Sequence, residues 1–356
     1  MDRERLVALN LVFKDYEDLG LRIIKYKKNH SEMDDEFVRS CRGMIVDINT
    51  NKIICMPPIK SMNTEEYNSL NYTNDSVIEE FIDGTMINMW YHNECWHIST
   101  RSSIGANCKW FSDKKFNELF EESNALNIDA MNTEYFYSFV LQHPENRIVT
   151  CYSEPKITLV FVGKVNEDNT VESIPYEDIA YDINVSIPQS YQFEENSSIE
   201  ALIEYVNKKD YEFQGVVLKN GIHRTKIRNP NYNYARQLKG NTRNMKYLYY
   251  DLLKTGKMGE YLNFYPEFTQ LFNIFSSEFS DMAKNLHQNY MNYHVRKSVK
   301  DIKEIYFPFR PHTYNLHKLF LENRSPVTPN VVSNYLNTLE PAQIVYIINY
   351  KFYKKN

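Results

Sequence analysis

The residues of this chain that most directly suggest chemistry with a polyanion lie between Arg224 and Lys257. Nine residues of this stretch are basic and Asp251 is its one acidic residue. The interleaved tyrosines are Tyr232, Tyr234, Tyr247, Tyr249 and Tyr250. Basic side chains can follow a phosphate backbone while aromatic rings stack on unpaired bases. The residues that we expect to contact RNA are Arg236, Lys239, Arg243, Lys246, Tyr232 and Tyr234. A solvated helix face in a tyrosine-rich chain is the alternative interpretation.

The overall composition does not repeat this basic character. The 356-residue chain has a formal net charge of -5, so any basic surface must be local. It contains no run of 18 apolar residues and no apolar segment near its start, which predicts an intracellular protein, cytoplasmic or nuclear, that does not contact a membrane. The five cysteines lack metal-ligand spacing, and we expect reduced, mostly buried thiols. The histidines are scattered, so no metal site is predicted.

Two kinds of periodicity divide the chain. From about residue 40 to 230, short apolar runs alternate with polar turns, and the runs at 44–48, 53–56, 86–91, 96–99, 157–162 and 215–218 are typical of strands. Helices are expected at 113–126 and 199–207. This pattern predicts an α+β fold with antiparallel sheets.

Beyond about residue 245 the apolar period becomes helical. A stripe of large apolar residues with spacings of three and four runs from Phe268 to Leu286, after Pro266. We interpret this stripe as core. Two further helices are expected at 331–339 and 342–350, separated by Pro341. The predicted domains are therefore residues 1–245, rich in sheet, and residues 246–356, a small helical domain.

Seven short motifs occur in one order across residues 38–240. Residues 40–44 read Ser-Cys-Arg-Gly-Met, residues 58–63 Pro-Ile-Lys-Ser-Met-Asn and residues 83–85 Asp-Gly-Thr. Residues 99–104 read Ser-Thr-Arg-Ser-Ser-Ile and residues 143–149 His-Pro-Glu-Asn-Arg-Ile-Val. Residues 214–217 read Gln-Gly-Val-Val and residues 225–228 Thr-Lys-Ile-Arg. In order and spacing these motifs resemble those of the RNA ligases, the covalent nucleotidyltransferase superfamily, and most nearly the bacteriophage ligase that repairs tRNA.

The resemblance implies an ATP-grasp-like nucleotidyltransferase domain of antiparallel sheets with flanking helices. It also implies that a nucleotide or phosphate is bound by Arg42, Lys60, Asp83, Gly84, Arg101, Lys226 and Arg228. ATP or another nucleotide is the cofactor that the resemblance suggests.

Three residues depart from the family pattern. Phe81 stands at the position of the lysine that attacks the α-phosphate of ATP in these ligases, and a phenylalanine cannot form the phosphoramide. Val140 stands where a glutamate contacts the nucleotide sugar. Gln214 replaces a glutamate that helps to hold the metal, and a neutral amide is a weaker ligand for Mg²⁺ or Mn²⁺. No catalytic residue is therefore assigned, and a requirement for these metals is doubtful. Phe81 is interpreted as a core aromatic, with stacking on a base as the alternative.

Two functions remain open at this point. The first is a catalytically degenerate RNA-ligase-like protein, a pseudoenzyme that binds nucleotide or RNA 5′ phosphate ends through the retained cations. The second is a ligase of altered mechanism, with a substitute nucleophile or a preadenylated RNA substrate. A purely structural or partner-binding role is the third interpretation. RNA repair or processing, a viral source, and a protein partner for the helical domain follow only from analogy.

Overall fold

The structure is a computed structural model and describes residues 3–70, 76–123, 125–192 and 199–353. The chain forms two compact units, Met1–Arg236 and Gln237–Asn356. The division falls inside helix α7 (Pro230–Lys239). The predicted domain boundary after residue 245 stays a prediction.

The first sheet of the N-terminal unit contains four strands in the order β1-β2-β3-β4. The strands are β1 (Leu11–Tyr16), β2 (Leu21–Tyr26), β3 (Arg42–Asp47) and β4 (Ile53–Cys55), all antiparallel to their neighbours. The runs predicted at 44–48 and 53–56 match β3 and β4. Strands β1 and β2 lie before residue 40, outside the region in which strands were predicted.

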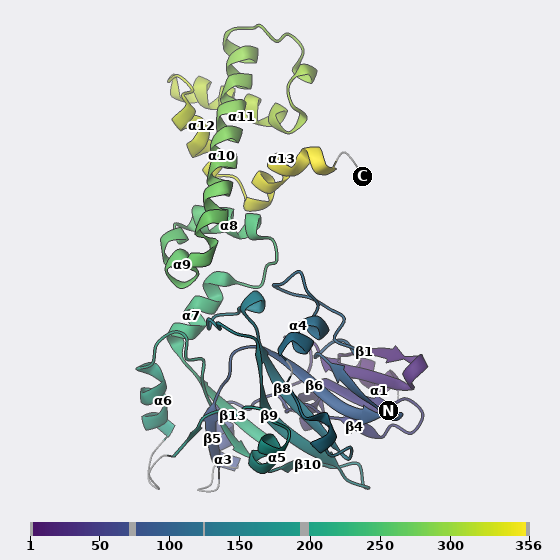
Figure 1. Cartoon of the computed structure of the whole chain (residues 1–356). Coiled ribbons are helices and arrows are strands. Elements are labelled where there is room, and N and C mark those ends of the chain that lie inside the picture. Colours follow the sequence, from purple (N-terminus) through teal and green to yellow (C-terminus); the bar gives the residue numbers. More distant parts are fainter. Residues whose placement is uncertain (1–2, 71–75, 124, 193–198, 354–356) are drawn as a thin grey trace. The chain divides into compact units, whose positions relative to one another are not determined.

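The second sheet contains five antiparallel strands in the order β10-β9-β8-β6-β7. The strands are β6 (Thr85–His92), β7 (Cys95–Ser99), β8 (Tyr135–Gln142), β9 (Lys156–Val165) and β10 (Val171–Ile174). One face packs its apolar side chains on helices α4 (Phe116–Ser123) and α5 (Glu177–Asp182), which lie beside these strands in Figure 1. Polar side chains occupy part of the other face, where Ser138 donates a 2.9 Å hydrogen bond to Asn88. One sheet face therefore packs on helices, whereas the other combines Trp90, Phe136 and Phe161, which pack with the first sheet, with polar side chains that can line a site.

The third sheet has the order β11-β5-β12-β13 and is also antiparallel. Its strands are β11 (Ser190–Tyr191), β5 (Val77–Glu80), β12 (Gly215–Asn220) and β13 (His223–Arg228). Side chains alternate between the two faces of a strand, so the last five residues of β13 divide into two sets. Thr225 and Ile227 are buried on the side of an apolar cluster that includes Val216 and Leu218. Arg224, Lys226 and Arg228 share the opposite face.

Four more helices complete the N-terminal unit. They are α1 (Arg3–Ala8), α2 (Glu36–Ser40), α3 (Thr64–Leu70) and α6 (Ile199–Asn207). The helix predicted at 199–207 is thus α6. The helix predicted at 113–126 is shorter in the structure, where α4 begins at Phe116 and ends at Ser123. Position 124 of the predicted range lies outside the described residues.

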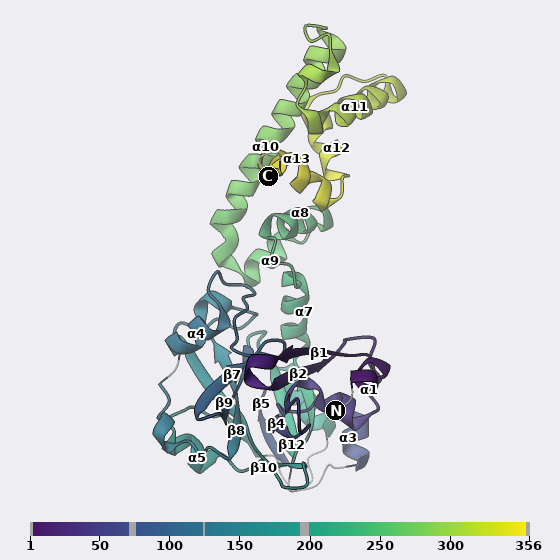
Figure 2. The ribbon, with the colours of Figure 1, turned by 90° about the vertical axis from the view of Figure 1, so that its right-hand side faces the viewer.

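The C-terminal unit is helical, as the change of period predicts (Figure 2). It contains α8 (Met245–Thr255), α9 (Met258–Phe264), α10 (Thr269–Tyr290), α11 (Arg310–Asn323), α12 (Pro329–Asn337) and α13 (Pro341–Tyr353). The apolar stripe of α10 packs in the core of this unit, with Phe272, Met282 and Leu286 buried. Pro266 opens a separate 3-10 turn (Pro266–Phe268), and α10 starts after it. The antiparallel-sheet α+β fold with a helical C-terminal part is therefore confirmed.

The cysteines are less uniformly buried than the sequence predicts. Cys41 and Cys55 are buried, but Cys95 and Cys151 are exposed, so the expectation of mostly buried thiols is wrong for these two. Burial raises the pKa of Cys41 to about 12. Within the described part of the chain, no helix combines the length and the apolar character needed to span a membrane.

Candidate functional site

The face of β13 that points away from the apolar cluster carries three cations, and we call Arg224, Lys226 and Arg228 the cationic face. The register places them beside β12 and β5, because Lys226 pairs with Val217 and Val217 pairs with Glu79. Arg228 pairs with Gly215, whose carbonyl accepts a 2.9 Å hydrogen bond from the backbone N–H of Phe81. The cationic face therefore adjoins the chain segment at the lysine position of the ligase motif.

Phe81 lies directly against this face. The Lys226 ammonium is 5.1 Å from the centre of the Phe81 ring, and the Arg228 guanidinium carbon is 5.3 Å from it. Phe81 is half-buried and is absent from the apolar clusters of the described residues. The ring thus lies at the edge of the core and faces two cations, whereas stacking of Phe81 on a base stays a prediction.

The electrostatics of the face reflect crowding of like charges. Burial, then the guanidinium groups of Arg42 and Arg228, lower the pKa of Lys226 to about 6. Burial and Arg42 lower the pKa of Arg224 to about 10. Burial and Arg236 also lower the pKa of Arg228. These shifts show that Arg42 of β3 and Arg236 of α7 lie within electrostatic reach of the face.

Counter-ions are scarce around these cations. Across residues 3–70, 76–123, 125–192 and 199–353, no carboxylate forms an ion pair with Arg42, Lys226, Arg228 or Arg236. The Nε atoms of Arg224 and Arg228 are buried without a hydrogen-bond partner in the same part of the chain. Buried donors and charges normally have partners, so this arrangement favours an anionic ligand.

Two other predicted cations approach the site from neighbouring segments. The Arg101 guanidinium donates a 2.8 Å hydrogen bond to the Tyr26 carbonyl and stacks on the Tyr26 ring, 4.2 Å from its centre. Burial lowers the pKa of Arg42, and the charge of Arg101 adds to this effect, which places the two guanidinium groups near one another. Lys60 lies two residues before Met62, whose N–H donates a 3.0 Å hydrogen bond to the Arg224 carbonyl. The structure therefore brings Arg42, Arg101, Lys226 and Arg228 to the region around β13, and it places Lys60 on the segment whose Met62 pairs with that strand.

The predicted ligand residue Asp83 is used inside the protein. Its Oδ2 accepts hydrogen bonds from the backbone N–H groups of Val149 and Thr150 at 2.9 and 3.0 Å. Its Oδ1 accepts a 2.7 Å hydrogen bond from the Tyr232 hydroxyl, and Asp83 is only 4% exposed. Asp83 thus positions the segment after Phe81, while contact with a nucleotide stays a prediction for Gly84.

The segment 143–149, which closely matches its ligase counterpart, holds the same turn. Asn146 donates a 3.1 Å hydrogen bond to the Thr85 hydroxyl, and Arg147 Nε donates to the Val149 carbonyl at 2.8 Å. The motif is therefore structural in this chain: it fixes residues 83–85 beside β8.

The two replaced glutamate positions are both buried. Val140 is 7% exposed, and a Cβ added to Gly84 would lie 2.6 Å from its Cγ1. Gln214 is 5% exposed, and its Oε1 is buried without a hydrogen-bond partner among the described residues. The apolar and neutral side chains leave the site without the carboxylates that the family pattern supplies.

The described carboxylates around the site do not suit Mg²⁺ or Mn²⁺. Glu79 is ion-paired with Lys219 and accepts a hydrogen bond from Tyr176 at 2.5 Å. The oxygens of Asp83 are engaged as described above. Burial raises the pKa of Glu80, which favours its neutral form. Hard divalent cations require available anionic oxygens, and these three groups do not offer them.

Glu122, His143 and Glu145 form a separate cluster whose candidate ligand atoms lie within 4.8 Å of one another. His143 Nδ1 accepts from the Glu145 N–H at 3.1 Å, so Nε2 carries the proton and donates to Glu122 at 3.1 Å. The Lys114 ammonium pairs with both carboxylates, at 2.9 and 2.7 Å. Protein groups therefore satisfy this cluster without a metal.

The basic stretch is less available to RNA than its composition suggests. Tyr232 is fully buried, and Lys239 is 4% exposed with its ammonium 5.0 Å from the centre of the Tyr265 ring. Lys246 forms a 2.8 Å ion pair with Glu278. Stacking of Tyr232 on a base is therefore wrong, because Tyr232 is a hydrogen-bond donor in the interior. Arg236, Tyr234 and Arg243 are exposed, and RNA contact by them stays a prediction.

Sequence reasoning missed the buried network next to the cationic face. Lys219 of β12 donates hydrogen bonds to Tyr176 at 2.9 Å and to the Val160 carbonyl at 3.0 Å, besides its pair with Glu79. The contact with Val160 links β12 to β9 of the second sheet. One signal could have revealed this network. Glu79 and Lys219 are charged residues within strands, at positions where the alternation of side chains predicts a buried face.

Comparison with known proteins supports the motif-based resemblance. The chain is 23% identical over 362 residues to an Autographa californica nuclear polyhedrosis virus protein whose description proposes a bifunctional polynucleotide kinase/RNA ligase, covering 94% of this chain and 50% of the relative. It is 30% identical over 193 residues to an RNA ligase of Rhodothermus phage RM378, covering 43% of this chain and 44% of the relative. The chain thus spans about half the length of these two relatives. An immediate-early protein ICP-46 homolog of Invertebrate iridescent virus 6 is 23% identical, over 83% of this chain and 72% of its own.

No protein-family model matches the chain. Among solved structures, an archaeal ATP-dependent RNA ligase gives a TM-score of 0.48 at 12% identity, covering 72% of this chain and 66% of that chain. Since this score is below 0.5, it adds nothing to the argument. The sequence relation to viral RNA ligases confirms the predicted resemblance.

Proposed function

We propose that this relative of viral RNA ligases is a catalytically degenerate, RNA-ligase-like protein that binds nucleotide or RNA 5′ phosphate ends on the cationic face. The observation that carries the proposal is the set of buried and half-buried cations around β13 that form no ion pair with a carboxylate of the described residues. Their mutual repulsion is relieved when a phosphate supplies the missing negative charge. Phosphate groups also accept the charge-assisted hydrogen bonds that guanidinium groups donate.

The same residues explain why binding is proposed without catalysis. Phe81 offers no nucleophile, and Gln214 offers no carboxylate for a divalent metal. Phosphoryl transfer depends on positioning and on neutralising charge at the reacting phosphate. The cationic face supplies neutralisation, whereas the group that would form the covalent bond is missing.

The test compares RNA oligomers that differ only at the 5′ end. Titration calorimetry would measure the affinity of the protein for ATP and for one single-stranded RNA that carries a 5′ monophosphate, a 5′ triphosphate or a 5′ hydroxyl. We expect the phosphorylated ends to bind at least about tenfold more tightly than the hydroxyl end, since a charge-assisted hydrogen bond contributes about 1.5–3 kcal/mol. Equal affinity for all three ends would contradict the proposal.

Matched variants assign the binding to residues. Arg228→Gln removes a cation of the face that has no ion pair, whereas Lys208→Gln removes an exposed lysine that pairs with Glu204 on α6. We expect Arg228→Gln to abolish the preference for phosphorylated ends and Lys208→Gln to leave it unchanged.

A second candidate function has one specific observation in its favour: a lysine already lies at the site of the lost nucleophile. Lys226 is 5.1 Å from the Phe81 ring centre, and its pKa of about 6 makes the amine neutral at pH 7.5. A neutral, desolvated lysine is a competent nucleophile. In this mechanism the Nζ lone pair attacks the α-phosphorus of ATP, the bond to the β-phosphate oxygen breaks, pyrophosphate leaves with that electron pair, and Nζ loses one proton.

Intact-protein mass spectrometry separates the two candidates. The protein would be incubated with ATP, and separately with GTP, in the presence of Mg²⁺ or Mn²⁺. A gain of one nucleoside monophosphate that disappears in Lys226→Met would establish the altered enzyme. We expect no mass gain, which leaves noncovalent binding as the function.

A further inference from the structure

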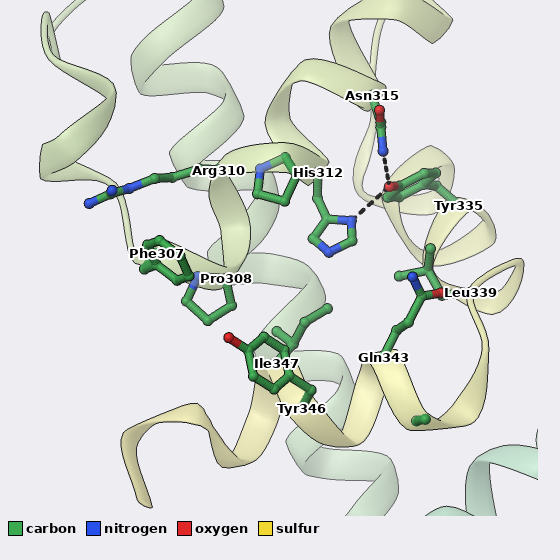
Figure 3. A pocket seen from close by; sticks show the side chains of 12 residues that line it. Phe307, Pro308, Arg310, His312, Asn315, Tyr335, Leu339, Gln343, Tyr346 and Ile347 are labelled. Carbon is green, nitrogen blue, oxygen red and sulfur yellow. Dashed lines mark hydrogen bonds between the residues drawn. The ribbon is translucent and has the colours of Figure 1, made fainter. Parts of the chain in front are cut away.

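A pocket of about 550 Å³ opens in the helical C-terminal unit, between the start of α11 and helices α12 and α13 (Figure 3). Its apolar wall includes Phe307, Pro308, Leu339, Tyr346 and Ile347. Phe307 is 50% exposed and Tyr346 43% exposed. Pockets of this size with aromatic walls and a few polar groups are typical of sites for small planar ligands.

The His312 ring can act as a hydrogen-bond donor toward the pocket. Asn315 Nδ2 donates a 2.9 Å hydrogen bond to the Tyr335 hydroxyl oxygen, and His312 Nδ1, 2.7 Å away, is the one acceptor that the described residues offer to the hydroxyl proton, so we assign that proton to the hydrogen bond with Nδ1. The proton of the neutral His312 ring is therefore on Nε2. Burial lowers the pKa of His312, which favours this neutral ring.

The Nε2 edge of His312 is aimed into the pocket. Figure 3 shows the ring with Nδ1 toward Tyr335 and the opposite edge toward the space between Pro308, Gln343 and Ile347. His312 is 9% exposed, and its Nε2 forms no hydrogen bond with another described residue. This edge of the ring is therefore accessible from the pocket and can donate to an acceptor on a ligand.

A second donor follows from the cap of α13. Gln343 Oε1 accepts a 3.0 Å hydrogen bond from the Glu340 N–H, which leaves its side-chain NH₂ to face a ligand. Among the residues that the structure describes, no aspartate or glutamate lines the pocket. The ligand that fits is thus flat, apolar on its faces and rich in acceptors at its edge.

The aromatic wall is held in place before a ligand arrives. Phe307 stacks on Tyr350 with ring centres 5.4 Å apart, and Tyr350 also contacts Tyr346 at 5.6 Å. The Arg310 guanidinium lies 5.3 Å from the centre of the Phe307 ring and donates hydrogen bonds to the Ile305 and Lys303 carbonyls. A cation beside a stacking surface suits a base that is attached to a phosphate backbone.

We propose that this pocket binds one unpaired nucleobase of single-stranded RNA, with the base against Tyr346 and its ring-nitrogen or carbonyl acceptors facing His312 and Gln343. Guanine, cytosine and uracil all present such acceptors. The proposal deepens the proposed function in that it takes RNA as the ligand, but it does not require the cationic face to bind a 5′ phosphate.

The test uses a single-stranded RNA 12-mer with a 5′ hydroxyl, so that the cationic face has no terminal phosphate to bind. Fluorescence anisotropy would compare this RNA with an oligomer of the same length whose sugars lack bases. The variant is Tyr346→Ala, and Tyr346→Trp restores a ring. Tyr314→Ala is the matched control, because Tyr314 is 49% exposed on α11 and does not line the pocket.

We expect Tyr346→Ala to weaken binding of the base-containing RNA by about tenfold, since stacking of one base contributes on that scale. Tyr346→Trp and Tyr314→Ala should bind as the unmodified protein does. The baseless oligomer should not distinguish the variants. An equal loss for the baseless oligomer, or no loss in Tyr346→Ala, would overturn the proposal.

A photochemical arm identifies the contact directly. The same RNA carrying 5-iodouracil would be irradiated with the protein and the crosslinked peptide sequenced. We expect the crosslink on Tyr346 or Phe307. Crosslinks only outside residues 307–347, together with normal ATP binding that is sensitive to Arg228→Gln, would reject the pocket while leaving the proposed function intact.

Discussion

The Nζ atom of Lys226 lies 5.1 Å from the centre of the Phe81 ring, so a lysine lies beside the residue that replaces the ligase lysine. Arg228 shares the same ring at 5.3 Å. An aromatic face attracts cations through its quadrupole, and it adds no charge of its own. Phe81 thereby accommodates positive charge that a lysine at the same position would repel.

The pH dependence of ATP affinity tests this arrangement. The pKa of Lys226 is about 6 in the free protein, and a bound polyanion raises it. Below pH 6 the ammonium is present before binding. Above pH 6 binding must take up a proton, so we expect affinity to fall as pH rises from about 6 to 8. Calorimetry in buffers of different ionisation enthalpy would measure the proton uptake.

Lys226→Met is the control for this pH dependence, because it preserves the titration of ATP itself. We expect the variant to bind more weakly and to lose the proton uptake. The altered-enzyme function predicts the opposite trend, since the rate of adduct formation would rise as the amine loses its proton near pH 6.

Restoring the three replaced residues tests whether the rest of the site is intact. We expect the combined variant Phe81→Lys, Val140→Glu and Gln214→Glu to gain one adenylate with ATP and Mg²⁺, measured by intact mass. Phe81→Lys alone should gain none, because it adds a cation without any carboxylate to hold a metal. The matched control is Val140→Glu with Gln214→Glu, which keeps Phe81. An adduct on that control would reveal a different nucleophile.

Asp83 is expected to stabilise the fold rather than to bind a ligand. Asp83→Asn would present an NH₂ group to donors that now bind a carboxylate oxygen, and we expect a loss of about 3 kcal/mol in the free energy of unfolding. Tyr232→Phe removes one of these hydrogen bonds and should cost about 1 kcal/mol. Urea denaturation followed by circular dichroism would measure both. If Asp83→Asn lowered the affinity for ATP without lowering stability, Asp83 would be a ligand-binding residue and this prediction would be contradicted.

Gly215 is expected to be irreplaceable at the start of β12. Its φ is +137°, and an added Cβ would lie 2.0 Å from the Ile227 carbonyl oxygen. We expect Gly215→Ala to destabilise the protein by at least about 3 kcal/mol, because the clash is with backbone. Gly221 has φ of +57° and open space around it, so Gly221→Ala should cost only about 1 kcal/mol. Thermal denaturation would measure the stability of both variants. Similar losses of stability for Gly215→Ala and Gly221→Ala would show that β12 relaxes around the added methyl group, and would contradict this prediction.

The sequence was most informative where periodicity or motif order carried the signal. The runs at 44–48 and 215–218 lie in strands, and the stripe from Phe268 to Leu286 packs as core, because burial imposes a regular period on both kinds of element. The order of the motifs predicted that cations from distant segments meet near β13. Sequence alone did not reveal that the Asp83 carboxylate accepts hydrogen bonds from Val149, Thr150 and Tyr232. Residues that are distant in sequence and meet only in the fold leave no local sequence pattern.

The basic stretch illustrates the same limit. Arg236 and Lys239 count equally as basic residues of this stretch, yet Arg236 is exposed and Lys239 is buried against Tyr265. Helical phase and tertiary packing separate these two residues, and neither is visible in a count of charges. The C-terminal pocket was missed for a related reason, because its walls come from segments on three helices.

The alternation of β13 also bears on how such a protein can diverge. Thr225 and Ile227 anchor the strand in the apolar cluster, whereas Arg224, Lys226 and Arg228 face the site. Substitutions on the second set alter charge, reactivity and ligand preference while the packing of the first set is untouched. A lineage can therefore exchange an ancestral chemistry for a new one along a single strand face, and the scaffold tolerates the intermediates because the mutations that retune the site are not the mutations that would unfold it.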